Sequence, residues 1–140
     1  DQCTCLQNIF RHLENGGKLI FNIFDPNLEL MCSNLGFSGS RMRRLREIKH
    51  PKSRNPVIVW YSTEYDLTNQ LIDEIWIYDE TDSSGLVINR SYVPLKIRYI
   101  YRFEMQYLLE LSGFSIEALY KDFHRNEFKH GEEQIWICRK

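Results

Sequence analysis

The sequence has no long apolar run and no strong excess of charge. No apolar run reaches the roughly 20 residues that a membrane-spanning helix needs, so we expect no transmembrane segment and no membrane partner. The formal net charge of −1 excludes a polybasic nucleic-acid binder as the identity of the whole chain, although it is compatible with a local basic patch. The opening residues are polar and helical in pattern, so we expect no signal peptide. A length of 140 residues favours one domain.

Metal-ligand and nucleotide-binding motifs are also missing. The four cysteines form no Cys-x-x-Cys pair, and Cys3 and Cys5 are too close for ordinary zinc-ligand spacing. We therefore predict no metal site, reduced thiols and a cytoplasmic protein, with a disulfide framework as the alternative. Neither glycine-rich phosphate-binding pattern is present. Gly16 and Gly17 follow a helical segment and precede a strand, which predicts a turn rather than a phosphate-binding loop.

What the sequence does contain begins with a helix, a turn and an apolar strand. The apolar residues of segment 1–15 follow the spacing of one buried helix stripe. They are Leu6, Ile9, Phe10 and Leu13. Gly16-Gly17 ends this helix. The nearly continuous apolar run 18–24 is typical of a central parallel strand that is covered on both faces. Residues 28–35 predict a short helix.

The middle of the chain changes from a basic segment to β-rich runs. Residues 37–56 carry seven cations within 41–54 against the single acid Glu47, and they predict an exposed loop or a short helix within a loop. Runs 57–65, 71–80 and 86–99 are separated by turn sequences, which predicts a three-stranded antiparallel meander. We expect one face of this meander to pack on the core and the other to face a ligand or a partner.

A helix and two strands are predicted for the rest of the chain. Residues 101–112 return to a helical period and end at Gly113. The residues of the predicted buried stripe are Phe103, Tyr107, Leu108 and Leu111. Strands are predicted over 114–123 and 134–139, with a loop at 124–133 between them. This alternation indicates an α/β sheet, and such sheets bind ligands at the carboxyl ends of parallel strands, here at 22–27.

Several of these segments, in this order, resemble parts of one enzyme family. Residues 6–21, with Gly16-Gly17 before the apolar run, resemble the helix and fifth strand of class I S-adenosylmethionine-dependent methyltransferases, and Asp25-Pro26 resembles the end of that strand. Residues 101–114 resemble the family's late helix. Segments 115–123 and 134–140 resemble its antiparallel sixth and seventh strands, and 94–98 is similar to the end of the sheet inserted in some small-molecule members. The resemblance implies the C-terminal portion of a Rossmann-like methyltransferase sheet (fifth to seventh strands) with an inserted three-stranded antiparallel meander.

The family's first four strands, its glycine-rich loop and its ribose-binding acid have no counterpart in this sequence. The resemblance therefore implies the C-terminal half of such an enzyme, as a shortened recombinant form, a proteolytic remnant or one piece of a split protein. We expect no residue that binds S-adenosylmethionine here, and no donor binding or activity by this chain alone. In the complete enzyme, a small-molecule acceptor would attack the sulfonium methyl in line, aided mainly by alignment and exclusion of water. The inserted sheet would act as a lid.

Four of the candidate acceptor-binding residues flank the predicted core. Asn22 and Asp25 stand at the carboxyl edge of the first strand, although Asp25 is also a candidate cap for the next helix. Arg98 and Tyr101 lie where the inserted sheet returns to the core. There Arg98 would clamp an anionic group, unless it forms an ion pair with Glu104 or with the acidic strand.

The other candidates are aromatic residues and a histidine. Tyr61 and Trp76 would stack on a substrate ring, unless they fill the core. His124 is the candidate general base, with an exposed loop histidine as the alternative interpretation. No catalytic residue follows from the motifs themselves.

Two rival functions remain open at this point. One is a non-catalytic assembly module, because an incomplete sheet has an unpaired edge that recruits a second copy or a missing N-terminal half. The other is RNA methylation through the basic segment. That segment has no interleaved aromatics for base stacking, which favours a solvated lid loop, so nucleic acid is not the partner we expect.

Overall fold

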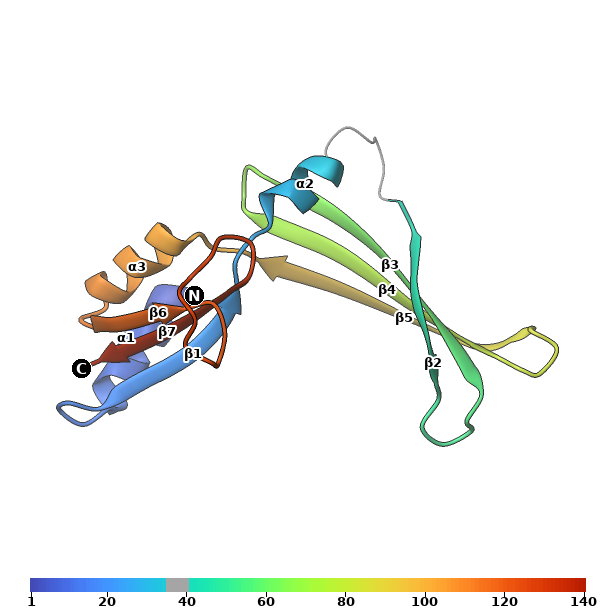
Figure 1. The fold of residues 1–140 in the computed structure, drawn as a ribbon, viewed down its shortest axis with the longest axis horizontal. Helices are drawn as coiled ribbons and strands as arrows, with labels where there is room; N and C mark the ends of the chain where they lie inside the picture. The colour runs from blue at the N-terminus through green and yellow to red at the C-terminus, as the bar shows by residue number, and fades with distance from the viewer. Residues whose placement is uncertain (35–40) are drawn as a thin grey trace. The chain divides into compact units, whose positions relative to one another are not determined.

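The computed structural model describes residues 1–34 and 41–140, which form two compact units (Figure 1). The first unit contains Asp1–Met31 and Tyr99–Lys140, and the second contains Cys32–Arg98. Leu35 and residues 37–40 of the predicted segments lie outside the described residues. The elements are α1 (Gln2–His12), β1 (Lys18–Phe24), α2 (Leu28–Asn34), β2 (Arg43–Lys49), β3 (Pro56–Asp66), β4 (Leu71–Thr81), β5 (Val87–Arg98), α3 (Arg102–Leu111), β6 (Ser115–Tyr120) and β7 (Glu133–Arg139).

The first unit is a three-stranded antiparallel sheet with two helices on one face. The strand order is β1-β7-β6, so the last strand of the chain is the central one. Leu6 of α1 and Leu109 of α3 pack with Trp136 and Cys138 of β7 in one buried core. Packed against this core are all the remaining apolar residues of the predicted α1 stripe and one face of β1: Ile9, Phe10, Leu13, Leu19, Phe21 and Ile23. The stripe predicted for the first helix is therefore confirmed.

The prediction of a parallel, doubly covered first strand is wrong. β1 pairs antiparallel with β7, from Lys18 opposite Arg139 to Phe24 opposite Glu133. Its other edge pairs with no strand among the described residues. Its side chains alternate in burial, and Ile20 is 61% exposed. Burial of both faces needs a second layer and a second neighbouring strand, and the described part of the chain supplies neither.

The predicted apolar stripe of α3 is wrong for three of its four residues. Phe103, Tyr107 and Leu111 are 59%, 59% and 79% exposed, and only Leu108 packs against the core. The buried residues of α3 are Met105 and Leu109. The helix carries two apolar stripes next to each other, and helical spacing alone does not tell which stripe faces the sheet.

The second unit is a four-stranded antiparallel sheet in the order β2-β3-β4-β5. The three predicted strands are present as β3, β4 and β5. The loop prediction for the basic segment is wrong, because Arg43–Lys49 forms β2 and pairs with β3, from Arg43 opposite Tyr61 to Lys49 opposite Pro56. The meander therefore has a fourth strand. Charged side chains suit an edge strand because they reach water there, and Arg44 also pairs with Glu47 at 2.8 Å.

A buried carboxylate ties β4 to its neighbours in the second unit. Asp79 is 3% exposed, and its two oxygens accept hydrogen bonds from Arg90 Nε at 2.5 Å and Arg90 Nη2 at 2.7 Å. Trp60 Nε1 of β3 donates to the same carboxylate at 3.0 Å. The Arg90 hydrogen bonds lower the pKa of Asp79 from its ordinary value of 3.8, against the opposing effect of burial.

This ion pair predicts an acid-sensitive second unit. Because the folded-state pKa of Asp79 is lowered, its contribution to stability is complete above about pH 3.8 and is lost as the pH falls through the folded-state pKa. Replacing Arg90→Gln raises that pKa and leaves a buried carboxylate without its cation. We expect acid unfolding, followed by circular dichroism, to begin at a higher pH than in the wild type. The control is Lys96→Gln, which removes the exposed pair between Lys96 and Asp73 at 3.2 Å. An equal effect of the two variants would contradict the prediction.

Candidate functional site

A buried carboxylate lies directly after β1, at the edge where sequence analysis places ligand binding. Asp25 is 3% exposed, and its backbone N–H donates to Glu132 O at 2.8 Å, which fastens the end of β1 to the start of β7. The Asp25 side chain accepts from Gly131 N at 2.8 Å and from Gln134 Nε2 at 2.6 Å. A buried charge requires such donors, because each replaces a hydrogen bond to water.

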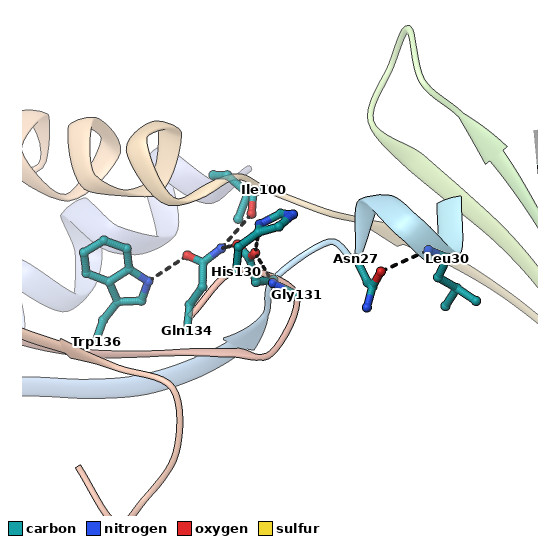
Figure 2. Close-up of polar contacts among 8 residues, drawn as sticks. Asn27, Leu30, Ile100, His130, Gly131, Gln134 and Trp136 are labelled. Carbon is teal, nitrogen blue, oxygen red and sulfur yellow. Dashed lines mark hydrogen bonds and ion pairs between the residues drawn. The ribbon is translucent and has the colours of Figure 1, made fainter. Parts of the chain in front are cut away.

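Gln134 extends this network through the core of the first unit (Figure 2). It is 0% exposed, and its amide nitrogen also donates to Ile100 O at 3.0 Å. Its amide oxygen accepts from Trp136 Nε1 at 3.1 Å. One buried amide thus joins the end of β1, the segment before α3 and the middle of β7. This arrangement fixes the Asp25 carboxylate in position.

His130 is the exposed member of the network. Its Nδ1 lies 2.5 Å from Asp25 Oδ2, while its side chain is 51% exposed. A neutral imidazole that donates from Nδ1 to a carboxylate keeps an unprotonated Nε2. In Figure 2 the other ring nitrogen of His130 points away from Gly131 and Gln134. An oriented imidazole with a free lone pair, backed by a buried carboxylate, is the arrangement of a general base.

The backbone around His130 is constrained by a glycine and by a helix cap. Gly131 has a φ of +84°, and a Cβ there would lie 3.3 Å from Asn27 Nδ2. Asn27 Oδ1 accepts from Leu30 N at 3.0 Å and so caps α2. The interpretation of Asp25 as the cap of this helix is therefore wrong. Asp25 instead anchors the segment that carries His130.

Two of the predicted acceptor-binding residues lie in the same unit as Asp25. Asn22 is on the exposed face of β1, where its Nδ2 donates to Glu133 Oε2 at 3.1 Å. Tyr101 precedes α3 and is partly exposed. Its ring packs edge-on against Tyr99, with 5.6 Å between ring centroids. Tyr99 is 2% exposed, so it supports Tyr101 from within the core.

The remaining predicted acceptor-binding residues belong to the second unit. Tyr61 and Trp76 stand opposite each other on β3 and β4 and stack with 5.8 Å between their ring centroids. The Trp76 indole N–H donates to Glu74 Oε2 at 2.8 Å, so it already has a partner. Arg98 is the last residue of β5 and is exposed.

His130 and Gln134 were missed by the sequence analysis, which selected His124 from the same loop. His124 is exposed, and its backbone N–H donates to Asp122 Oδ1 at 2.9 Å within a turn. His124 is not among the contacts of Asp25 that the structure shows. The prediction of an antiparallel final strand could have identified His130, because His130 shortly precedes that strand. An antiparallel neighbour of β1 begins beside the end of β1, next to Asp25.

Possible metal ligands and the cysteines are the other reactive side chains of the described residues. Among residues 1–34 and 41–140, no cluster of three or more His, Cys, Asp or Glu side chains is placed to hold a metal ion. The four cysteines are unpaired, and burial raises the pKa of the Cys138 thiol to about 11. None of the helices described here is long and apolar enough to cross a membrane.

No protein-family model and no curated protein matches the chain, whereas several solved structures share its fold. The CcbJ methyltransferase from Streptomyces caelestis aligns over 98% of this chain with a TM-score of 0.69 and 16% identity. An S-adenosylmethionine-dependent methyltransferase from Clostridium acetobutylicum ATCC 824 aligns over 99% with a TM-score of 0.72 and 12% identity. A third is the S-adenosylmethionine-bound structure of an amino pentose methyltransferase from Micromonospora echinaspora involved in calicheamicin biosynthesis. It aligns over 98% with a TM-score of 0.61 and 11% identity.

The chain spans about half the length of each of these solved structures: 52%, 52% and 49%. At these identities the likeness shows the fold. It confirms the predicted fold class, because the chain has the α/β fold of part of these methyltransferases.

The geometry of the network predicts the tautomer of His130. At a pH where the imidazole is neutral, we expect ¹⁵N NMR to place the proton on Nδ1 and to leave Nε2 unprotonated. Replacing Asp25→Asn removes the carboxylate that selects this tautomer, so the Nδ1–H form should lose its dominance. His124 is the control, because its ring shifts should be the same in both proteins. A His130 that already favours Nε2–H in the wild type would contradict the geometry.

Proposed function

We propose that this chain is the C-terminal, acceptor-side part of an S-adenosylmethionine-dependent methyltransferase that acts on a small molecule. The observation that supports this proposal is the fold likeness, which extends over nearly the whole chain and over only half of each neighbour. Fold alone does not define chemistry. The Asp25–His130 pair adds a chemical argument, because it supplies an oriented base at the predicted ligand-binding edge.

The donor site, in this proposal, belongs to an N-terminal half that pairs with the open edge of β1. Unpaired backbone N–H and C=O groups along a strand edge bind a further strand. Ile20 on β1 is 61% exposed and would be covered by such a partner. The neighbour from Micromonospora was determined with S-adenosylmethionine bound and is about twice as long as the part matched here.

His130 is the proposed proton acceptor. When bound, S-adenosylmethionine would supply an electrophilic methyl group, and its carbon–sulfur bond would break with the electron pair staying on the sulfur of the departing sulfide. His130 Nε2 would take the proton from the N–H or O–H of the acceptor as that atom forms its bond to carbon. Asp25 Oδ2, already bonded to Nδ1, stabilises the imidazolium that results. General-base catalysis of this kind contributes about 10²- to 10⁴-fold in rate.

Donor binding tests the division of the enzyme into two halves. We expect calorimetry to detect no binding of S-adenosylmethionine to the 140-residue chain and clear binding once the chain carries its N-terminal extension or is mixed with a separately expressed N-terminal half. Micromolar binding to the 140-residue chain would refute the proposed division. Absence of binding in every form would refute the methyltransferase assignment itself.

Two histidines of one loop provide a matched test of the base. In the extended, donor-binding form, methyl transfer to a panel of amino pentoses and other small amines is measured. His130→Gln should lower kcat by about 10²- to 10⁴-fold. Donor affinity should be unchanged. His124→Gln should leave kcat unchanged. A loss of activity in the His124 variant alone would reverse the assignment.

A further inference from the structure

The exposed apolar stripe of α3 forms a separate surface in the first unit. Its members, Phe103, Tyr107 and Leu111, recur at intervals of four residues and are each at least 59% exposed. Residues at this spacing lie above one another on one face of a helix. The other side of α3 is occupied, because Met105 and Leu109 fill the core. Large apolar side chains gathered on one exposed face mark a binding surface.

A second row of residues runs beside this stripe and carries opposite charges at its two ends. Arg102 lies at the start of the helix and Glu110 near its end, with Gln106 between them. Gln106 Nε2 donates to Glu110 Oε1 at 3.0 Å. Arg102 lies over the rings of Phe103 and Phe128, 5.0 and 5.5 Å from their centroids. These contacts hold the charged groups along one flank of the stripe.

We propose that α3 docks antiparallel against α3 of a second copy of this chain. In an interface with twofold symmetry, Tyr107 meets Tyr107 of the other copy and Phe103 meets Leu111 of the other copy. The charged row of one copy then lies beside that of the other and runs in the opposite direction. Arg102 of each copy therefore approaches Glu110 of the other. The charge pattern is thus self-complementary in an antiparallel pair, which favours a second copy of the chain as the partner.

The surface on α3 lies toward the edge of the sheet opposite to the strand edge that is proposed to bind the donor-binding half. α3 contacts β6, which is the edge of the sheet opposite to β1 (Figure 1). The two association surfaces therefore lie over different edges of one sheet. The dimer does not depend on the proposed methyltransferase function.

The size of the surface sets the strength that we expect. A helix of ten residues is about 15 Å long. Such a helix pair buries less than the roughly 800 Å² per partner of a standard stable interface. We therefore expect a reversible dimer that forms at micromolar or higher concentrations.

Charge reversal across the twofold axis tests this arrangement. Sedimentation equilibrium over a concentration series should show dimer formation by the wild-type chain. Arg102→Glu alone and Glu110→Arg alone each place like charges opposite each other twice, and each should weaken dimerisation by about tenfold. The double variant Arg102→Glu/Glu110→Arg restores both opposite-charge pairs and should recover most of the lost affinity. Circular dichroism checks that each variant remains folded.

Two further variants keep the test decisive. Tyr107→Gln removes the central apolar contact and should abolish the dimer, and because Tyr107 is exposed the fold should persist. Ile20→Glu on β1 is the control, and the dimer should survive it. A chain that stays monomeric at all concentrations would overturn the proposal. A dimer that Ile20→Glu dissociates and the charge reversals leave unchanged would show pairing through the strand edge instead. Neither a monomeric chain nor a dimer formed through the strand edge would change the result expected from the donor-binding experiment.

Discussion

The buried carboxylate of Asp25 is the contact on which the arrangement of the first unit depends. It is bonded to the backbone of Gly131 and to the buried amide of Gln134, and that amide reaches Ile100 and Trp136. The end of β1, the start of β7 and the approach to α3 therefore meet at one charge. Because each buried polar atom in this chain of contacts is satisfied by the next one, the loss of any member leaves another without its partner.

The same carboxylate connects packing with chemistry. The donors that offset the burial of Asp25 also fix the direction of its free lone pairs, and His130 is bonded to one of its oxygens. A half-exposed imidazole on a rigid, buried support meets the main requirement for a base, which is a fixed orientation before the substrate arrives. His124 instead lies exposed in a turn, where its backbone N–H donates to Asp122 Oδ1.

Surfaces that remain exposed in the first unit are as informative as its core. The open edge of β1 offers backbone hydrogen bonds, which suit a further strand. The stripe on α3 offers side chains, which suit a further helix. These surfaces differ in chemistry and lie toward opposite edges of the sheet, so the partners proposed for them differ as well. In the second unit, the edge strand β2 carries several cations, which discourage pairing with a further strand.

The sequence by itself determined the described helices and all but one of the strands, because periodicity, glycine stops and turn residues act over a few neighbouring positions. Even the wrong assignment of β2 followed from such local rules, since a strand made mostly of charged residues resembles a loop. The tertiary structure decided which stripe of α3 is buried, that β1 pairs antiparallel with β7, and that His130 rather than His124 meets Asp25. Asp25 and Gln134 are 109 residues apart in the chain. Only the antiparallel register of β1 and β7 brings them together, and register depends on the packing of the whole sheet.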